Sequence, residues 1–196
     1  ATLTATLPAL LIFAPLPDQL FGLFTLLIVI LFRRGWQQQQ AGWLFLAGLL
    51  LSIASFLSVG NFALLILLGS YTLFKLWQQS IPLRHILQLL IPFGLGTVTI
   101  WLIYWLGWRV APWLVIQAGL DEHFALVIAQ RSYNTWLIFN LLDLAIFTGL
   151  PAFVAFIGAI LVAMRKIRFR VMSEAQMWAV STAVLILALN FSGSTR

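Results

Sequence analysis

The segment Ile86–Gly107, ILQLLIPFGLGTVTIWLIYWLG, contains no charged residue from end to end. A helix of about 20 apolar residues spans the ~30 Å hydrocarbon core of a bilayer. The rest of the chain agrees, because it is 62% hydrophobic and 8% charged, with a mean hydropathy of +1.03. Soluble domains are about 45–50% apolar and about 25% charged. The sequence therefore predicts an all-α, polytopic membrane protein and excludes a water-soluble fold.

The whole chain divides into apolar segments separated by charge, Gln, Pro or Gly. These segments predict about seven spans, at residues 2–16, 19–32, 41–59, 62–76, 86–107, 136–163 and 175–191. We find no repeat and no flexible linker, so residues 1–196 are predicted to form a single transmembrane domain. Because the chain starts at Ala1 and no basic segment precedes the first apolar run, we expect a fragment of a longer protein.

The distribution of basic residues predicts the orientation in the membrane. Three of them fall in the loops of one side, namely Arg109, Arg131 and Arg196. The other eight fall on the opposite side: Arg33, Arg34, Lys75, Arg84, Arg165, Lys166, Arg168 and Arg170. Since cytoplasmic loops carry the excess of Lys and Arg, the C-terminus is predicted to lie outside. The net charge of +6 then reflects membrane topology, and we expect no nucleic-acid partner.

Residues 107–135 form the one substantial outward loop. Pro112 and several charges interrupt it, so we predict one or two helices lying in the membrane interface, anchored by Trp108 and Trp113. Arg131 offers a bidentate fork and His123 a second donor, a combination suited to a lipid-linked phosphate. The alternative is that these polar groups only cap and anchor the interfacial helix.

Asp143 lies inside an otherwise apolar segment, and Asn140 shares its helical face. A carboxylate at membrane depth costs at least ~2.5 kcal/mol on insertion scales, so we expect it to face a partner or a polar cavity. Arg131 and Tyr133 are near enough in sequence to provide that partner. One interpretation is a polar site that opens outward at the head of this helix. The other is a structural ion pair that fixes the interfacial helix to the bundle.

The residue inventory limits other chemistry. The chain has no cysteine and only two histidines, so we predict no metal centre and no definite cofactor. Asp18, beside a proline turn, could bind a divalent cation, act as a base or simply cap a helix. The sequence contains no phosphate-binding glycine loop and no recognisable catalytic triad, so the catalytic residues stay unassigned.

Several short motifs occur together along the chain. They are Pro8–Gln19, Gly48–Asn61, His123 followed by Arg131–Trp136, Asn140–Pro151 and Leu189–Arg196. In this order they resemble the later transmembrane portion of bacterial membrane glycosyltransferases of the type C superfamily. The resemblance covers nearly the whole chain.

This resemblance implies transfer of a sugar from a polyprenyl-phosphate donor to an acceptor at the outer membrane face, by inverting displacement. It also implies that Arg131 and His123 contact the donor phosphate, and that Tyr133, Trp136, Asn140 and Asp143 shape the outward pocket. The superfamily usually carries its catalytic carboxylate in a first outward loop, and no such motif is visible here. The expected partners are membrane lipids and a polyprenyl-phosphate sugar.

Two further functions stay open. The first is a non-catalytic helical subunit that binds other membrane subunits of a larger complex. The second is a transporter with Asp143 as its coupling site. Transporters commonly show inverted repeats, and no convincing pair of halves is visible in this sequence.

Overall fold

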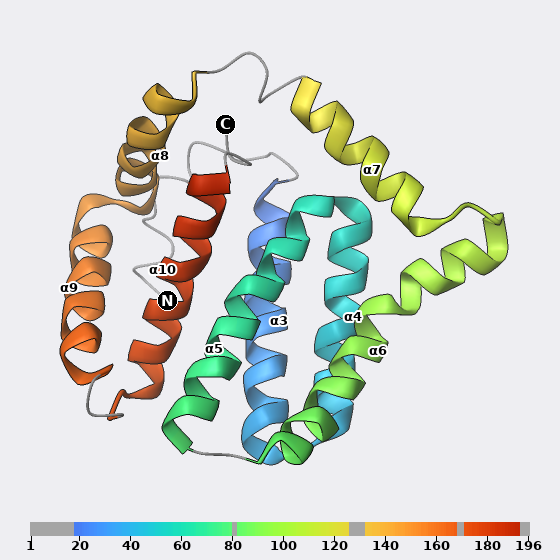
Figure 1. Ribbon diagram of the computed structural model, residues 1–196, viewed down its shortest axis with the longest axis horizontal. Helices are drawn as coiled ribbons and strands as arrows, with labels where there is room; N and C mark the ends of the chain where they lie inside the picture. Colours follow the sequence, from blue (N-terminus) through green and yellow to red (C-terminus); the bar gives the residue numbers. More distant parts are fainter. Residues whose placement is uncertain (1–17, 80–81, 126–131, 168–170, 193–196) are drawn as a thin grey trace. The chain divides into compact units, whose positions relative to one another are not determined.

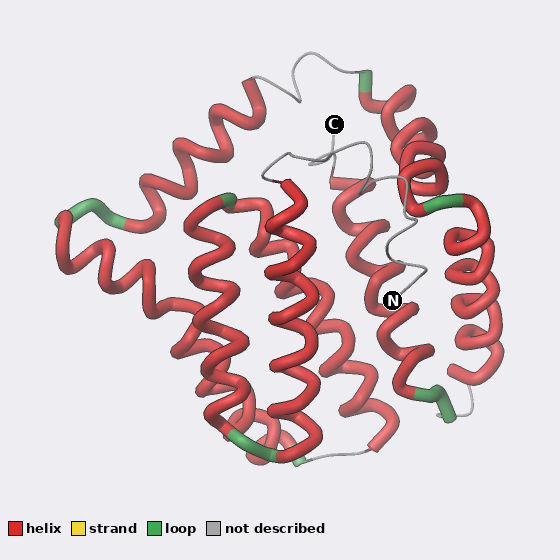
Figure 2. Tube along the Cα trace, turned by 180° about the vertical axis from the view of Figure 1, so that it is seen from behind, coloured by secondary structure: helices red, strands yellow, loops and turns green. Residues whose placement is uncertain are grey.

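The computed structural model describes residues 18–79, 82–125, 132–167 and 171–192, and every regular element in this part of the chain is helical (Figure 2). The elements are α3 (Asp18–Gln38), α4 (Ala41–Leu57), η1 (Val59–Ala63), α5 (Leu64–Gln79), α6 (Leu83–Trp108), α7 (Pro112–His123), α8 (Tyr133–Thr148), α9 (Leu150–Ile167) and α10 (Glu174–Ser192). The prediction of an all-α fold is confirmed. The predicted span at 2–16, Arg131 and residues 193–196 lie outside the described residues.

Most of the described helices are apolar, and several have the length of membrane spans. Five segments are long and apolar enough to cross a bilayer: Leu20–Gln38, Val59–Gln79, Arg84–Trp108, Leu150–Ile167 and Glu174–Ser192. Ala41–Leu57 and Thr135–Thr148 are shorter apolar helices. Large apolar side chains are exposed on them, for example Leu106 at 73% and Leu73 at 65%. Such a surface suits hydrocarbon rather than water, and the chain is a polytopic α-helical membrane protein.

The segment 136–163 was predicted to be one span, but it is not one continuous helix. The segment 136–163 consists of α8 and α9, which follow one another with a break at Gly149 (Figure 1). Gly149 has a φ of 84°, which a residue with a Cβ rarely adopts. Pro151 follows in the first turn of α9, where its missing N–H is not needed. Averaged hydropathy does not detect this break, because one Gly and one Pro lower the mean of a long apolar segment only slightly.

The predicted loop at 107–135 begins as helix. The helix α6 continues to Trp108, and α7 occupies Pro112–His123, so the prediction of a helix in this loop is confirmed. The backbone turns at Arg109, which has a φ of 59° and whose N–H donates to the Trp105 carbonyl at 2.9 Å. Figure 1 shows α7 running back from the end of α6 at a sharp angle. The interfacial position of α7 stays a prediction.

The described helices form two compact units. One contains α3 from Leu20, α4, η1, α6 and α7, and the other contains α5 from Leu65 together with α8, α9 and α10. The expectation of one transmembrane domain stays a prediction.

The first unit is built on a close parallel contact between α4 and α6. Gly48 and Gly96 lie at the contact, where a Cβ on Gly48 would come within 2.0 Å of the Phe93 carbonyl oxygen. One turn further along, the Ile100 N–H donates to Ser52 Oγ at 3.1 Å. Lipid gives helices little hydrophobic reason to associate, so close backbone packing and hydrogen bonds must hold them together. In the sequence, small residues along the 41–59 span predict close helix packing, namely Gly42, Gly48, Ser52, Ala54 and Ser55. Gly48, Ser52 and Ser55 make such contacts with α6, whereas Gly42 does not.

A buried chain of hydrogen bonds extends this contact. The Trp101 indole Nε1–H donates to Ser55 Oγ at 3.0 Å, and the Ser55 hydroxyl donates to the Ser52 carbonyl at 2.9 Å. Ser52 and Ser55 are fully buried and Trp101 is 6% exposed. Each polar group therefore has a partner at a depth where water cannot supply one.

The turn between α3 and α4 is fixed by its backbone. Gln39 has a φ of 54°, and the Gln40 N–H donates to the Gly35 carbonyl at 3.0 Å. This six-to-one bond is the mark of a Schellman C-cap, whose left-handed residue is usually glycine. The Gln39 side chain offsets part of the backbone strain by donating to the Trp36 carbonyl at 2.8 Å.

We expect Gln39→Gly to raise the free energy of unfolding by about 0.5–1 kcal/mol. The left-handed conformation costs about 1–2 kcal/mol for a residue with a Cβ, and the lost side-chain bond and the freedom of glycine offset part of the gain. Thermal unfolding in detergent, followed by tryptophan fluorescence, measures the change. The matched control, Gln37→Gly within α3, should destabilise by about 0.5–1 kcal/mol. A lower melting temperature for Gln39→Gly would contradict this account of the turn.

The second unit joins α5 to the start of α10. The ring of Tyr71, which is fully buried, stacks on Trp178 at 3.9 Å between centroids and 11° between planes. The Tyr71 hydroxyl lies 3.3 Å from Glu174 Oε1, and Gln78 Nε2 donates to the Met172 carbonyl at 3.0 Å. The end of α5 therefore lies beside the turn that joins α9 to α10.

Candidate functional site

Two side chains of the predicted site, Tyr133 and Asn140, contact the last turns of α10 from the first half of α8. The Tyr133 hydroxyl, in the first turn of α8, donates to the Phe191 carbonyl at 2.8 Å. The last carbonyls of a helix have no partner within the helix. Tyr133 therefore caps α10 and ties the two helices together.

An asparagine pair lies one to two turns deeper between the same helices. Asn140 Nδ2 donates to Asn190 Oδ1 at 2.9 Å, and Asn190 Nδ2 donates to the Leu137 carbonyl at 3.2 Å. Asn190 is 3% exposed, and Asn140 is half-buried. The pair gives α8 and α10 a fixed register, as polar side chains between membrane helices commonly do.

Asn190 was missed as a site residue by the sequence analysis. Its signal was present, since it is the one amide in the apolar α10 after Gln176. The sequence placed Asn190 in a terminal motif, but it could not show that α10 returns alongside α8. The sequence does not tell which of the other helices α10 packs against.

Asp143 lies on α8 three residues after Asn140 and is half-buried. Residues at this spacing share a helical face. Within the described part of the chain, Asp143 makes no hydrogen bond or ion pair, whereas Tyr133 and Asn140 are engaged with α10. Of the two predicted partners, Tyr133 is therefore directed elsewhere, and Arg131 lies outside the described residues. The junction offers a carboxylate that the packing of α8 and α10 does not use.

His123 lies at the C-terminal end of α7 and is exposed. It belongs to the first unit, whereas Tyr133, Asn140 and Asp143 belong to the second. A joint phosphate contact by His123 and Arg131 stays a prediction.

The acids and histidines of the described residues form no cluster of three or more that could hold a metal ion. Where Asp18 begins α3, the structure describes its backbone alone, so its role as a cap or cation ligand stays open.

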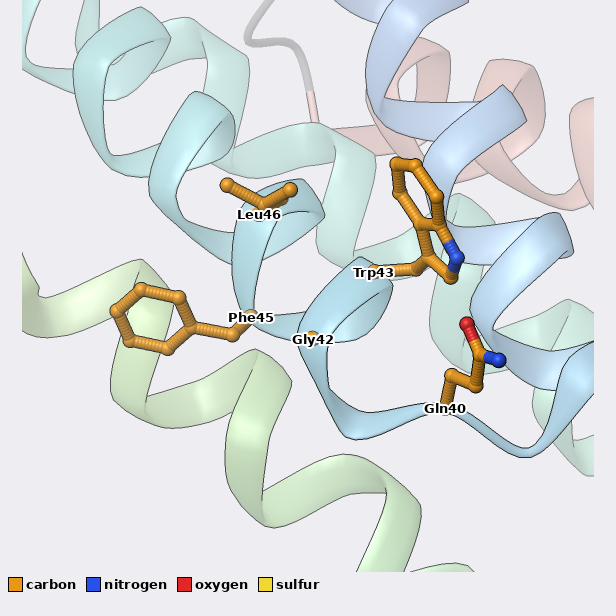
Figure 3. Close-up of a pocket in the computed structure, with 5 residues that line it drawn as sticks. All are labelled: Gln40, Gly42, Trp43, Phe45 and Leu46. Atoms are coloured by element: carbon orange, nitrogen blue, oxygen red, sulfur yellow. The ribbon is translucent and has the colours of Figure 1, made fainter.

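A hollow of about 420 Å³ lies at the start of α4, lined by Gln40, Gly42, Trp43, Phe45 and Leu46 (Figure 3). Trp43 and Phe45 point to opposite sides of the helix in this view. The Trp43 ring is covered by the guanidinium of Arg34, 4.4 Å from its centroid. Among its lining side chains the hollow offers one amide and no ionisable group, so we assign it no catalytic role.

Comparisons with known proteins give no match to a family model, to a curated protein or to a solved structure.

Proposed function

We propose that this chain is part of an integral membrane glycosyltransferase, which moves a sugar from a polyprenyl-phosphate donor to an acceptor at the outer membrane face. The observation that supports it best is the junction of α8 and α10. Two amides and a tyrosine hold these helices in register there, and the Asp143 carboxylate is left without a partner among the described residues. A membrane-embedded carboxylate without a structural partner is a functional candidate, because its insertion is costly.

The predicted orientation places this junction outside, where a lipid-linked sugar would meet an extracytoplasmic acceptor. Lys75 on α5 and Arg165 and Lys166 in the last turn of α9 belong to the basic, cytoplasmic side. The contact between Gln78 and Met172 brings the end of α5 beside the start of α10. The N-terminus of α10 then lies inside and its C-terminus, at the junction, lies outside in the inner membrane of a bacterium.

In this proposal Arg131 directly precedes the junction in sequence and contacts the donor phosphate. We expect Arg131→Ala to weaken the binding of undecaprenyl phosphate about tenfold, because a charge-assisted contact with phosphate is lost. Equilibrium binding of the radiolabelled lipid to the full chain in nanodiscs measures this effect. The matched control is Arg84→Ala, which also removes one arginine but lies in the first turn of α6, on the predicted cytoplasmic side. Equal affinities for Arg131→Ala and wild type would remove Arg131 from the site.

Asp143→Asn separates function from structure at the same junction. Because Asp143 has no partner to lose within the described part of the chain, the variant should melt no lower than wild type. It should nevertheless reduce sugar transfer in the full-length enzyme, measured with a radiolabelled polyprenyl-phosphate sugar. Unchanged transfer together with a lower melting temperature would identify Asp143 as a structural residue and contradict the proposal.

A second function, a helical subunit of a larger assembly, is favoured by α9. Only 6% of its 18-residue apolar stretch is buried within this chain, against 33% of the corresponding stretch of α6. A helix apolar on all sides contacts either lipid or other helices. A stable complex that survives purification in mild detergent, together with no binding of undecaprenyl phosphate, would favour the subunit.

A further inference from the structure

A hollow of about 300 Å³ lies in the first unit, between the C-terminal half of α6 and α7, with η1 beside it. No polar atom faces this groove, which we call the α6–α7 groove. The hydroxyl of Thr97, its one polar side chain besides the indoles, donates to the Phe93 carbonyl at 2.9 Å. The lining residues are Phe62, Thr97, Val98, Trp101, Leu102, Trp105, Pro112, Trp113 and Ile116.

Aromatic contacts hold the groove open. Trp105 of α6 meets Trp113 of α7 edge to face, with 6.3 Å between centroids and 64° between planes. Phe62 of η1 stacks on Trp101 at 6.0 Å and 26°. Rigid rings that pack on each other cannot collapse into the space between them without losing these contacts. The groove is therefore preformed and accepts an apolar occupant without rearrangement.

One cation lies on the loop where the two walls of the groove meet. Arg109 follows the last residue of α6, and Pro112 begins α7 three residues later. Arg109 is exposed, and within the described part of the chain it makes no ion pair. Its backbone is fixed by the bond from its N–H to the Trp105 carbonyl. A cation carried by a fixed backbone position beside an apolar groove is complementary to an amphiphile with a negative head.

The opposite end of α7 has the opposite charge. Asp121 and Glu122 lie about 14 Å from Pro112 along the helix, at 1.5 Å a residue. An anionic head group is repelled from that end and attracted to the end at Arg109. The charge pattern thus gives the occupant a direction, with its head at the loop and its chain along the groove.

We propose that the α6–α7 groove binds one acyl chain of an anionic bilayer phospholipid, with the lipid phosphate at Arg109. The lipid is the solvent of this protein, so it is present at far higher concentration than any other negatively charged amphiphile, and mass action favours it. The site does not depend on the proposed transferase activity. Phosphatidylglycerol is the probe, and zwitterionic phosphatidylcholine is its matched comparison.

Native mass spectrometry of the full chain, released from detergent with added lipid, counts the lipids that remain bound. We expect one tightly held phosphatidylglycerol, with phosphatidylcholine retained about fivefold less well, since one Arg near a lipid head group contributes about 1 kcal/mol. Arg109→Gln should reduce retention of phosphatidylglycerol about fivefold, to the level of phosphatidylcholine. Arg84→Gln, which removes the same charge at the other end of α6, should leave it unchanged. Equal losses in the two variants would overturn the proposal.

A second pair of variants tests the groove itself. Ile116→Trp fills it and should abolish the tightly held lipid, whereas Leu114→Trp, on the same helix but outside the groove lining, should not. Ile116→Phe serves the same purpose if the larger residue prevents folding, which the melting temperature reports. Retention of the lipid by a folded, filled variant would overturn the site. Displacement of phosphatidylglycerol by an equimolar amount of undecaprenyl phosphate would assign the groove to a polyprenyl carrier and overturn the phospholipid as occupant.

Discussion

Gly48→Ala should lower the free energy of unfolding by about 3 kcal/mol, the upper part of the range for overpacked cores. Its new Cβ would come 2.0 Å from the Phe93 carbonyl oxygen and 2.9 Å from the Thr97 nitrogen, where ordinary contacts begin at 3.4 Å. Both obstacles are backbone atoms, which no change of rotamer can move. The helices α4 and α6 must therefore separate to admit a single methyl group.

The cost extends beyond the clash, because the hydrogen bonds of the interface have fixed lengths. Ile100 N lies 3.1 Å from Ser52 Oγ, and Trp101 Nε1 lies 3.0 Å from Ser55 Oγ. A separation of more than 1 Å stretches both bonds past the range in which they are effective. Buried polar groups then lose their partners in a medium that contains no water.

Gly96→Ala should behave like Gly48→Ala, because its Cβ would lie 2.2 Å from the Phe45 carbonyl oxygen. Gly94→Ala is the matched control on the same helix, since its Cβ would have nothing within 4 Å. There alanine replaces glycine inside a helix, so stability should rise by about 0.5–1 kcal/mol. Unfolding in increasing dodecyl sulfate, followed by circular dichroism, ranks the three variants. A Gly48→Ala variant as stable as Gly94→Ala would contradict the close contact of α4 with α6.

The sequence predicted this interface in part. Small residues at Gly48, Ser52 and Ser55 indicated that α4 has a packing face. The sequence could not say which helix packs there, because every predicted span is apolar and no charge or register distinguishes the possible partners. The pairing with α6 depends on Gly96 lying opposite Gly48, and this match becomes visible only once the two helices are aligned in space.

The break between α8 and α9 shows a second limit of hydropathy. A window average treats Gly149 as neutral and Pro151 as a small interruption, so 136–163 reads as one span. The dihedral angles of Gly149 decide the matter, and they are a local property that an average removes. The consequence concerns the site, since the polar residues Tyr133, Asn140 and Asp143 all lie on α8 and none on α9.

At the candidate site, sequence reasoning identified the polar side chains of α8 and missed their partner. Asn140 is expected to shape an outward pocket, which stays a prediction, and its amide donates to Asn190. Asp143 was expected to have a partner in Arg131 or Tyr133, and the Tyr133 hydroxyl donates to α10. The identity of polar residues in an apolar helix is evident from sequence, whereas the direction of their hydrogen bonds depends on the neighbouring helix.

The asparagine pair makes the second large prediction. Asn190→Leu should lower the free energy of unfolding by about 1–2 kcal/mol, because the Asn140 amide then loses its acceptor at a half-buried position. Asn140→Leu should have a similar effect through the loss of the same bond. In the double variant neither amide is left alone and both positions are apolar, so its stability should return to within about 0.5 kcal/mol of wild type. Thermal unfolding of the four proteins in one detergent completes the cycle.

The same four proteins also distinguish packing from function at this junction. If the pair only sets the register of α8 against α10, the double variant should recover binding of undecaprenyl phosphate along with its stability. If Asn140 also contributes to an outward pocket, as the proposed function requires, stability should recover while binding stays at least about threefold weaker, a difference of about 0.6 kcal/mol. Full recovery of both quantities would restrict Asn140 to a structural role. Asp143, which has no partner among the described residues, would then be the α8 side chain to test in the transferase reaction.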